Sequence, residues 1–78
     1  MPRYFFDIRD GDAIAVDEEG LDLPDLRAAE VEAAQSLAHM AKDMPAGAER
    51  HDMAIEVRTV NGPLFKAAFV FAITRLRH

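Results

Sequence analysis

The dipeptide Asn61-Gly62 lies between two stretches in which apolar residues recur at every second position, and this pattern constrains the fold most strongly. Asn-Gly favours the positive φ angles of a tight hairpin turn. The flanking stretches, residues 53–59 and 64–71, have the period of two that is typical of β-strands. The sequence therefore predicts an antiparallel hairpin in the second half of the chain.

A second hairpin is predicted at the start of the chain. Residues 3–9 and 13–17 also alternate, and the dipeptide Asp10-Gly11 between them suits a tight turn. Gly20 then ends the second of these strands. The two hairpins together supply four antiparallel strands.

A single helix is predicted over residues 25–43, because apolar residues recur there at steps of three and four. Asp25 serves as its N-cap or as a first-turn acid favoured by the helix dipole, and Pro24 is tolerated at such a start. Pro45 and Gly47 end the pattern. The apolar stripe consists of Leu26, Ala29, Ala33, Leu37, Met40 and Met44.

These elements predict an α+β fold with two layers in the order ββαββ. An antiparallel four-stranded sheet, made of the two hairpins, carries the one helix on one face. Residues 1–78 form one domain that ends in a basic tail at residues 74–78. The sheet face toward the helix is expected to consist of Tyr4, Phe6, Ile8, Ile14, Val16, Met53, Ile55, Val57, Phe65 and Phe69.

Several segments carry a family resemblance: the opening MPRYFF followed by DGD, then DEEG and LPD before the helix, and IEVRTVNG with a closing apolar strand. In these segments the chain resembles a family of short proteins from soil and plant-associated alphaproteobacteria of the rhizobial type, catalogued as a domain of unknown function. The resemblance spans nearly the whole chain. It implies a compact ββαββ domain and supplies no catalytic or ligand-binding residues.

The composition of the 78 residues argues against several classes of protein. Without cysteine there is neither a disulfide framework nor a thiolate zinc site. No apolar run approaches the roughly 18 residues of a transmembrane helix, and the N-terminus lacks the pattern of a signal peptide. The net charge of −5 opposes non-specific binding to nucleic acid. We therefore expect a cytoplasmic protein with no cofactor and no membrane partner.

The segment DIRDGD carries three aspartates near the first predicted turn and is the candidate for a metal-binding loop. Calcium loops of the EF-hand type need Asp or Asn where this chain has Arg9, and glutamate six residues after the glycine, where it has an aspartate. We therefore predict a hairpin turn with surface acids and no metal site. The alternative is a divalent ion held by Asp7, Asp10, Asp12 and Asp17.

The chain shows no recognisable catalytic arrangement. His39, His51 and His78 do not form the i, i+4 pair of an HExxH motif. Ser36, the only serine, lies in the middle of the predicted helix, away from any strained turn. We therefore predict that the protein is not an enzyme.

The second face of the predicted sheet is apolar for a face in contact with water. Its expected members are Phe5, Ala13, Ala15, Ala54, Leu64, Ala68 and Val70. Val31 marks a shorter apolar strip on the back of the helix. We therefore predict an interaction or regulatory module that self-associates as a homodimer, by a sheet face or an edge strand. The candidate interface residues are Phe5, Ala15, Leu64, Ala68, Val70 and Val31.

Two alternatives follow from the uneven distribution of charge. Residues 1–25 carry a net charge of −6 and residues 50–78 a net charge of +3. The basic half suggests a nucleic-acid-binding or antitoxin-like dimer that uses Arg58, Lys66, Arg75 and Arg77. The acidic half suggests a metal- or small-ligand-binding protein that uses the N-terminal aspartates. An unidentified protein partner is compatible with each of these hypotheses.

Overall fold

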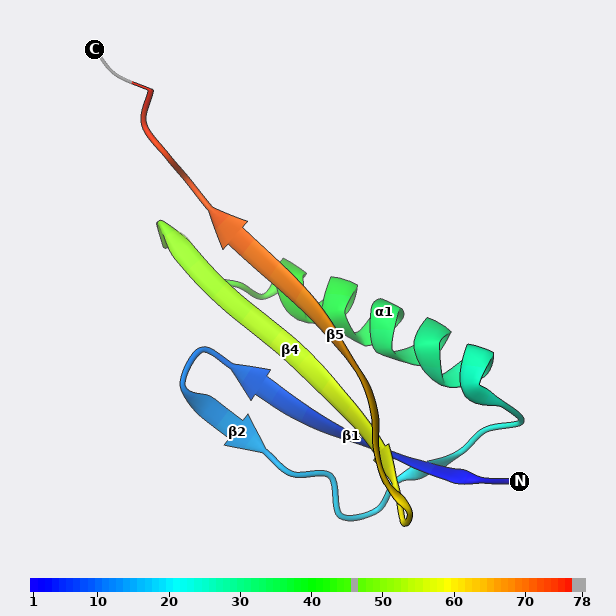
Figure 1. Cartoon of the computed structure of the whole chain (residues 1–78). Helices are drawn as coiled ribbons and strands as arrows, with labels where there is room; N and C mark the ends of the chain where they lie inside the picture. Colours follow the sequence, from blue (N-terminus) through cyan, green and yellow to red (C-terminus); the bar gives the residue numbers. More distant parts are fainter. Residues whose placement is uncertain (46, 77–78) are drawn as a thin grey trace.

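The computed structural model describes residues 1–45 and 47–76, which form one antiparallel sheet and one helix (Figure 1). The elements are β1 (Arg3–Asp10), β2 (Ala13–Ala15), β3 (Leu21–Asp22), α1 (Leu26–Lys42), β4 (Arg50–Thr59) and β5 (Gly62–Ala72). The strands run in the order β2-β1-β4-β5, and β3 pairs with β1 outside this path. The predicted α+β class is confirmed. The order ββαββ is not exact, because the sequence pattern did not predict the two-residue strand β3.

Both strands of the second hairpin are longer than predicted. β4 begins at Arg50 rather than at residue 53, and β5 spans Gly62–Ala72 rather than residues 64–71. Of the predicted basic tail, Arg77 and His78 lie outside the described residues. The helix starts and ends within one residue of the prediction, where Asp25 is the N-cap and Asp43 the C-cap.

The helix α1 packs along one face of the sheet, against β4 and β5. Its N-terminus is capped by Asp25, whose Oδ1 accepts a hydrogen bond of 2.9 Å from the N–H of Ala28. The buried core consists of Tyr4, Ala29, Ala33, Leu37, Met53, Ile55 and Val57. Because two of the three helix residues in this set are alanines, the helix axis can approach β4 closely. The core therefore lies between α1 and the middle of the sheet.

The first hairpin places Ile14 on the opposite face from the one predicted. Arg9 pairs with Ile14 across the two-residue loop Gly11-Asp12. Directly opposed residues share a face of a sheet, so Ile14 lies on the side of Arg9 and away from the helix. Ile14 is 57% exposed, and Val16, beyond the end of β2, is 62% exposed. The prediction that these two residues contribute to the core is therefore wrong.

In the second hairpin a β-bulge keeps the apolar residues of both strands on the helix side of the sheet. Thr59 pairs with Gly62, and a regular ladder from that point would set Val57 opposite Leu64. Instead the register shifts next to Val57, which pairs with Phe65. The extra residue on the bulged strand keeps Val57 and Phe65 on the same side, toward the helix.

The sheet face that α1 does not cover is called the open face below. Its members pair across β1, β4 and β5, and they are Phe5, Asp7, Arg9, Asp52, Ala54, Glu56, Arg58, Lys66, Ala68 and Val70. One cross-strand row of this face runs through all four main strands, from Ile14 through Arg9 and Ala54 to Ala68. These four residues therefore lie at the same height along the strands, one strand spacing apart.

Candidate functional site

A group of charged residues on the open face joins β1, β4 and the loop after β2. The Nε of Arg58 donates to Oδ2 of Asp7 at 2.8 Å, and its Nη2 donates to Oδ1 at 3.3 Å. The same guanidinium lies over the ring of Phe5, 4.7 Å from the ring centroid. A bidentate pair with a stacked ring fixes the guanidinium in one orientation. Arg58 therefore covers Phe5 on the open face.

Asp17 attaches the loop after β2 to this group. Its carboxylate accepts hydrogen bonds from the backbone N–H of Phe6 at 3.0 Å and of Glu19 and Gly20 at 3.1 Å each. Its own N–H donates to Oδ1 of Asp7 at 2.9 Å. Its carbonyl oxygen accepts from Nη2 of Arg58, also at 2.9 Å. Asp17 therefore fixes the loop to β1 and to Arg58 of β4, and two of its hydrogen bonds order the loop itself.

These contacts change the pKa values of the three groups. The hydrogen bond from Arg58 holds the pKa of Asp7 below its ordinary value of 3.8 and outweighs partial burial. Partial burial raises the pKa of Asp17, but its three backbone donors outweigh that effect, so this pKa is also lowered. The hydrogen bond to Asp7 raises the pKa of Arg58. The group therefore keeps its charges at neutral pH.

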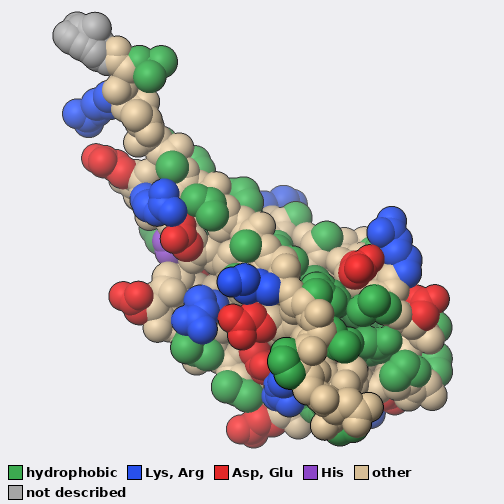
Figure 2. All heavy atoms as spheres, viewed as in Figure 1, with side chains coloured by type: hydrophobic (Ala, Val, Ile, Leu, Met, Phe, Trp, Pro, Cys, Tyr) green, Lys and Arg blue, Asp and Glu red, His purple; other side chains and the backbone are tan. Residues whose placement is uncertain are grey.

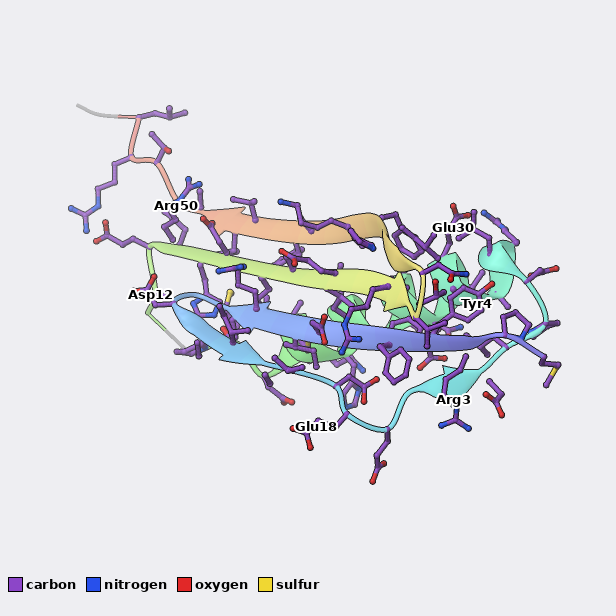
Figure 3. All side chains as sticks on the ribbon, turned by 60° about the horizontal axis from the view of Figure 1, so that its bottom comes forward. Arg3, Tyr4, Asp12, Glu18, Glu30 and Arg50 are labelled. Carbon is purple, nitrogen blue, oxygen red and sulfur yellow. The ribbon has the colours of Figure 1, made fainter. Side chains whose placement is uncertain are left out.

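A second polar group lies where the first hairpin turn meets the start of β4. Oδ1 of Asp10 and Nε2 of His51 are hydrogen-bonded, and the N–H of Gly11 donates to the carbonyl oxygen of Asp52 at 2.8 Å. An open hollow of about 280 Å³ lies beside these residues, and Asp12 and Arg50 complete its lining. Figure 3 shows Asp12 and Arg50 at the same end of the sheet. The turn is therefore fixed to β4 by one side-chain and one backbone contact.

The four aspartates that could have held an ion lie in two places, with Asp7 and Asp17 around Arg58 and Asp10 and Asp12 at the first hairpin turn. Asp7 pairs with Arg58, Asp17 accepts backbone N–H groups, Asp10 contacts His51, and Asp12 lines the hollow. Among residues 1–45 and 47–76, no three His, Cys, Asp or Glu side chains lie together so as to hold a metal ion. The DIRDGD segment thus divides its carboxylates between a cationic partner, a histidine and the solvent.

The candidate interface residues also fall into different places. Ala68 and Val70 lie on the open face of β5, and Leu64 lies at the bulge. Phe5 lies half-buried under Arg58. Ala15 pairs with Ile8, which places it on the opposite side of the sheet from Phe5, because the tight turn reverses the expected facing of β2. Val31 is exposed on α1.

Acidic and basic side chains occupy the middle of the open face. Besides the pair of Asp7 and Arg58, Arg9 contacts Glu56 at 3.7 Å. Figure 2 shows Lys or Arg and Asp or Glu side chains next to one another over the strands. The open face is therefore more polar than the sequence predicted, and its exposed aliphatic side chains lie on the outer strands β2 and β5.

The fold and these contacts define the class as a two-layer α+β protein with an antiparallel sheet. Residues 3–70 match the family described as Domain of unknown function (DUF6894), and the chain belongs to this family. No curated protein and no solved structure matches the chain. Among the described residues, no helix has both the length and the apolar character needed to span a membrane.

Proposed function

We propose that this protein is a non-enzymatic interaction module of the cytoplasm that self-associates as a homodimer. The observation that carries the proposal is the small core under a single helix. Ile55 and Val57 are the largest completely buried side chains among the described residues. A chain of this length buries only about 60% of its unfolded surface, so a second copy would add needed burial.

Exposed aliphatic side chains support the same proposal. Val70 is 55% exposed and Leu64 is 49% exposed, and both belong to β5. Ile14 lies on the same face at the opposite edge of the sheet, on β2. Apolar groups on an outer strand gain stability when a partner removes them from water. A reducing compartment such as the cytoplasm suits a chain that has no cysteine.

The polar groups of the structure give less support to the alternatives. Arg58 is bound to Asp7 and stacked on Phe5, so it does not offer a free cation to a phosphate. Lys66 and Arg75 lie exposed on β5 and beyond its end, and Arg77 is outside the described residues. His51 contacts Asp10, but among the described residues no serine, threonine or cysteine lines the hollow beside them. These arrangements favour a binding role over catalysis or nucleic-acid binding.

Sedimentation equilibrium of the native sequence tests the proposal. The expected result is a species of twice the chain mass of 8.7 kDa, with dissociation on dilution. A single species of 8.7 kDa at high micromolar concentration would overturn self-association. The measurement should be made at two salt concentrations. The dissociation constant of the dimer should change little between them, because an interface formed by apolar and backbone groups depends little on ionic strength.

A further inference from the structure

The two edges of the sheet are protected to very different degrees. Along the outer edge of β1, Arg3 and Tyr4 pair with β3, and residues 8–10 pair with β2. Between these two pairings, the carboxylate of Asp17 accepts the N–H of Phe6. The chain therefore covers this edge of β1 with its own short strands and one side chain.

The other edge is the strand β5, which has eleven residues and, within residues 1–45 and 47–76, no neighbour beyond it in the sheet order. In Figure 3, β5 is the outermost strand on its side of the sheet. The N–H of Ile73 donates to the carbonyl oxygen of Glu49 at 2.8 Å, so Ile73 faces β4. Because the facing of backbone groups alternates along an antiparallel strand, Lys66, Ala68 and Val70 direct their N–H and C=O groups outward.

The β5 edge has few of the features that usually prevent strand addition. Lys66 is its only charged residue, and Pro63 lies at its beginning, before the bulge. Within the described residues Lys66 has no ion pair, since Glu56 opposite it contacts Arg9. A long and mostly apolar edge of this kind is a template for another strand.

We propose that β5 pairs antiparallel with β5 of a second copy, around a twofold axis at Ala68. This inference rests on the proposed self-association and names its surface. In this register Ala68 lies opposite Ala68 of the second copy, and Lys66 lies opposite Val70 of that copy. About six backbone hydrogen bonds form, two for each of the three opposed pairs with outward-facing groups.

The register is chosen by charge and by size. It keeps the two Lys66 ammonium groups apart, whereas pairing centred on Lys66 would set them opposite each other. Asp52 is the cross-strand neighbour of Val70, so Asp52 of the second copy lies two strands from Lys66, about 10 Å between Cα atoms and within reach of its side chain. Lys66 would share this carboxylate with Arg50, which contacts Asp52 at 3.4 Å within its own chain. On the helix side, Ala67 lies opposite Phe69 of the second copy, a small residue against a large one.

An edge interface also costs less than a face-to-face interface. Packing two open faces together would remove the Arg9–Glu56 pair and the Asp7–Arg58 pair from water. Desolvation of ion pairs costs free energy that their mutual attraction does not always return. Pairing at β5 leaves both ion pairs in contact with solvent and satisfies backbone groups that are otherwise unpaired.

Distances between spin labels test the register. The chain has no cysteine, so Ala68→Cys and Ile14→Cys each provide a single labelling position. Both residues lie in the same cross-strand row, and Ile14 of the two copies would be seven strand spacings apart, about 34 Å. We expect strong dipolar broadening for labels at Ala68 and a distance near 34 Å for labels at Ile14. A face-to-face dimer would instead give the Ile14 labels a distance well below about 34 Å, set by the sheet spacing of about 10 Å and by the lateral offset of the two β2 strands.

A proline substitution gives an independent test. Ala68→Pro removes an N–H that points outward, so the pairing of β5 with β4 can persist and the circular dichroism spectrum should remain that of the folded chain. The expected product is a folded monomer, while the control Ala68→Ser keeps the N–H and stays dimeric. If the native protein and folded Ala68→Pro are equally dimeric, or if the Ile14 labels lie close together, the β5 interface is wrong although self-association stands. A monomeric native protein would overturn both.

Discussion

Arg58 binds Asp7 through two hydrogen bonds, of 2.8 Å and 3.3 Å, although the residues are 51 positions apart in the chain. The pair connects β4 with β1, and both residues also contact Asp17 in the loop between β2 and β3. Three segments that are distant in the sequence therefore share one set of charge-assisted hydrogen bonds. The stability of the first hairpin should depend on the charge of Asp7.

Acid should destabilise the protein through Asp7 and Asp17. Both carboxyls have pKa values below the ordinary value of 3.8 in the folded chain. Their stabilising contribution is therefore complete above about pH 4 and is lost as the pH falls through the lowered folded values. Urea unfolding at about pH 6 and about pH 3 measures this loss. The difference between the two free energies of unfolding should be smaller in Asp7→Asn than in the native sequence.

The matched control for this measurement is Asp12→Asn, because Asp12 is an exposed aspartate outside the Arg58 group. It should show nearly the same acid dependence as the native sequence. Equal acid dependence in all three proteins would contradict a role for Asp7 in the pH response.

Replacing Asp17 with alanine should destabilise the chain by about 1–3 kcal/mol, because three backbone N–H groups lose their acceptor. Glu18→Ala removes an exposed carboxylate next to it and should change the free energy of unfolding by less than about 0.5 kcal/mol. Amide hydrogen exchange supplies the local readout, since the N–H of Phe6 should exchange faster in Asp17→Ala. Unchanged exchange at Phe6 would show that this N–H does not depend on the carboxylate.

Gly20→Ala should cost more stability than Gly11→Ala. Both glycines have positive φ angles, +76° for Gly20 and +61° for Gly11, so both substitutions carry a backbone strain of about 1–2 kcal/mol. A Cβ at Gly20 would also lie 2.8 Å from Cγ of Arg3 and 2.9 Å from Cε2 of Phe5, whereas a Cβ at Gly11 meets nothing within 4 Å. Thermal unfolding of the two variants measures the difference. Equal losses would mean that the loop after β2 is not held closely against β1.

The hairpins show how far the sequence alone could lead. Apolar alternation correctly placed the strands of both hairpins near their observed positions, and it placed Val57 and Phe65 on one face. Ile14 was misplaced, although the turn contained the needed information. A two-residue loop pairs residues whose numbers have an odd sum, so Ile14 had to share a face with an odd-numbered residue of β1, here Arg9.

Local sequence patterns could not predict the β-bulge or the group formed by Asp7, Asp17 and Arg58. Leu64 gives no signal of its own that the register shifts beside it, because the shift follows from burying Val57 and Phe65 together. Asp17 appeared as one of several acids near a turn, and its three backbone donors come from Phe6 and from the loop that follows it. Contacts of this kind depend on the final path of the chain, which a single sequence does not specify by spacing alone.

The hydrogen bond from Phe6 to the carboxylate of Asp17 has a consequence for the size of any assembly. A sheet with two free sides can grow without limit, one copy after another, into a filament. Here the outer side of β1 is occupied by its own chain, so a sheet that gains a neighbour at β5 offers no comparable site at its far end. Raising the protein concentration would then increase the number of dimers, and each assembly would still contain two copies.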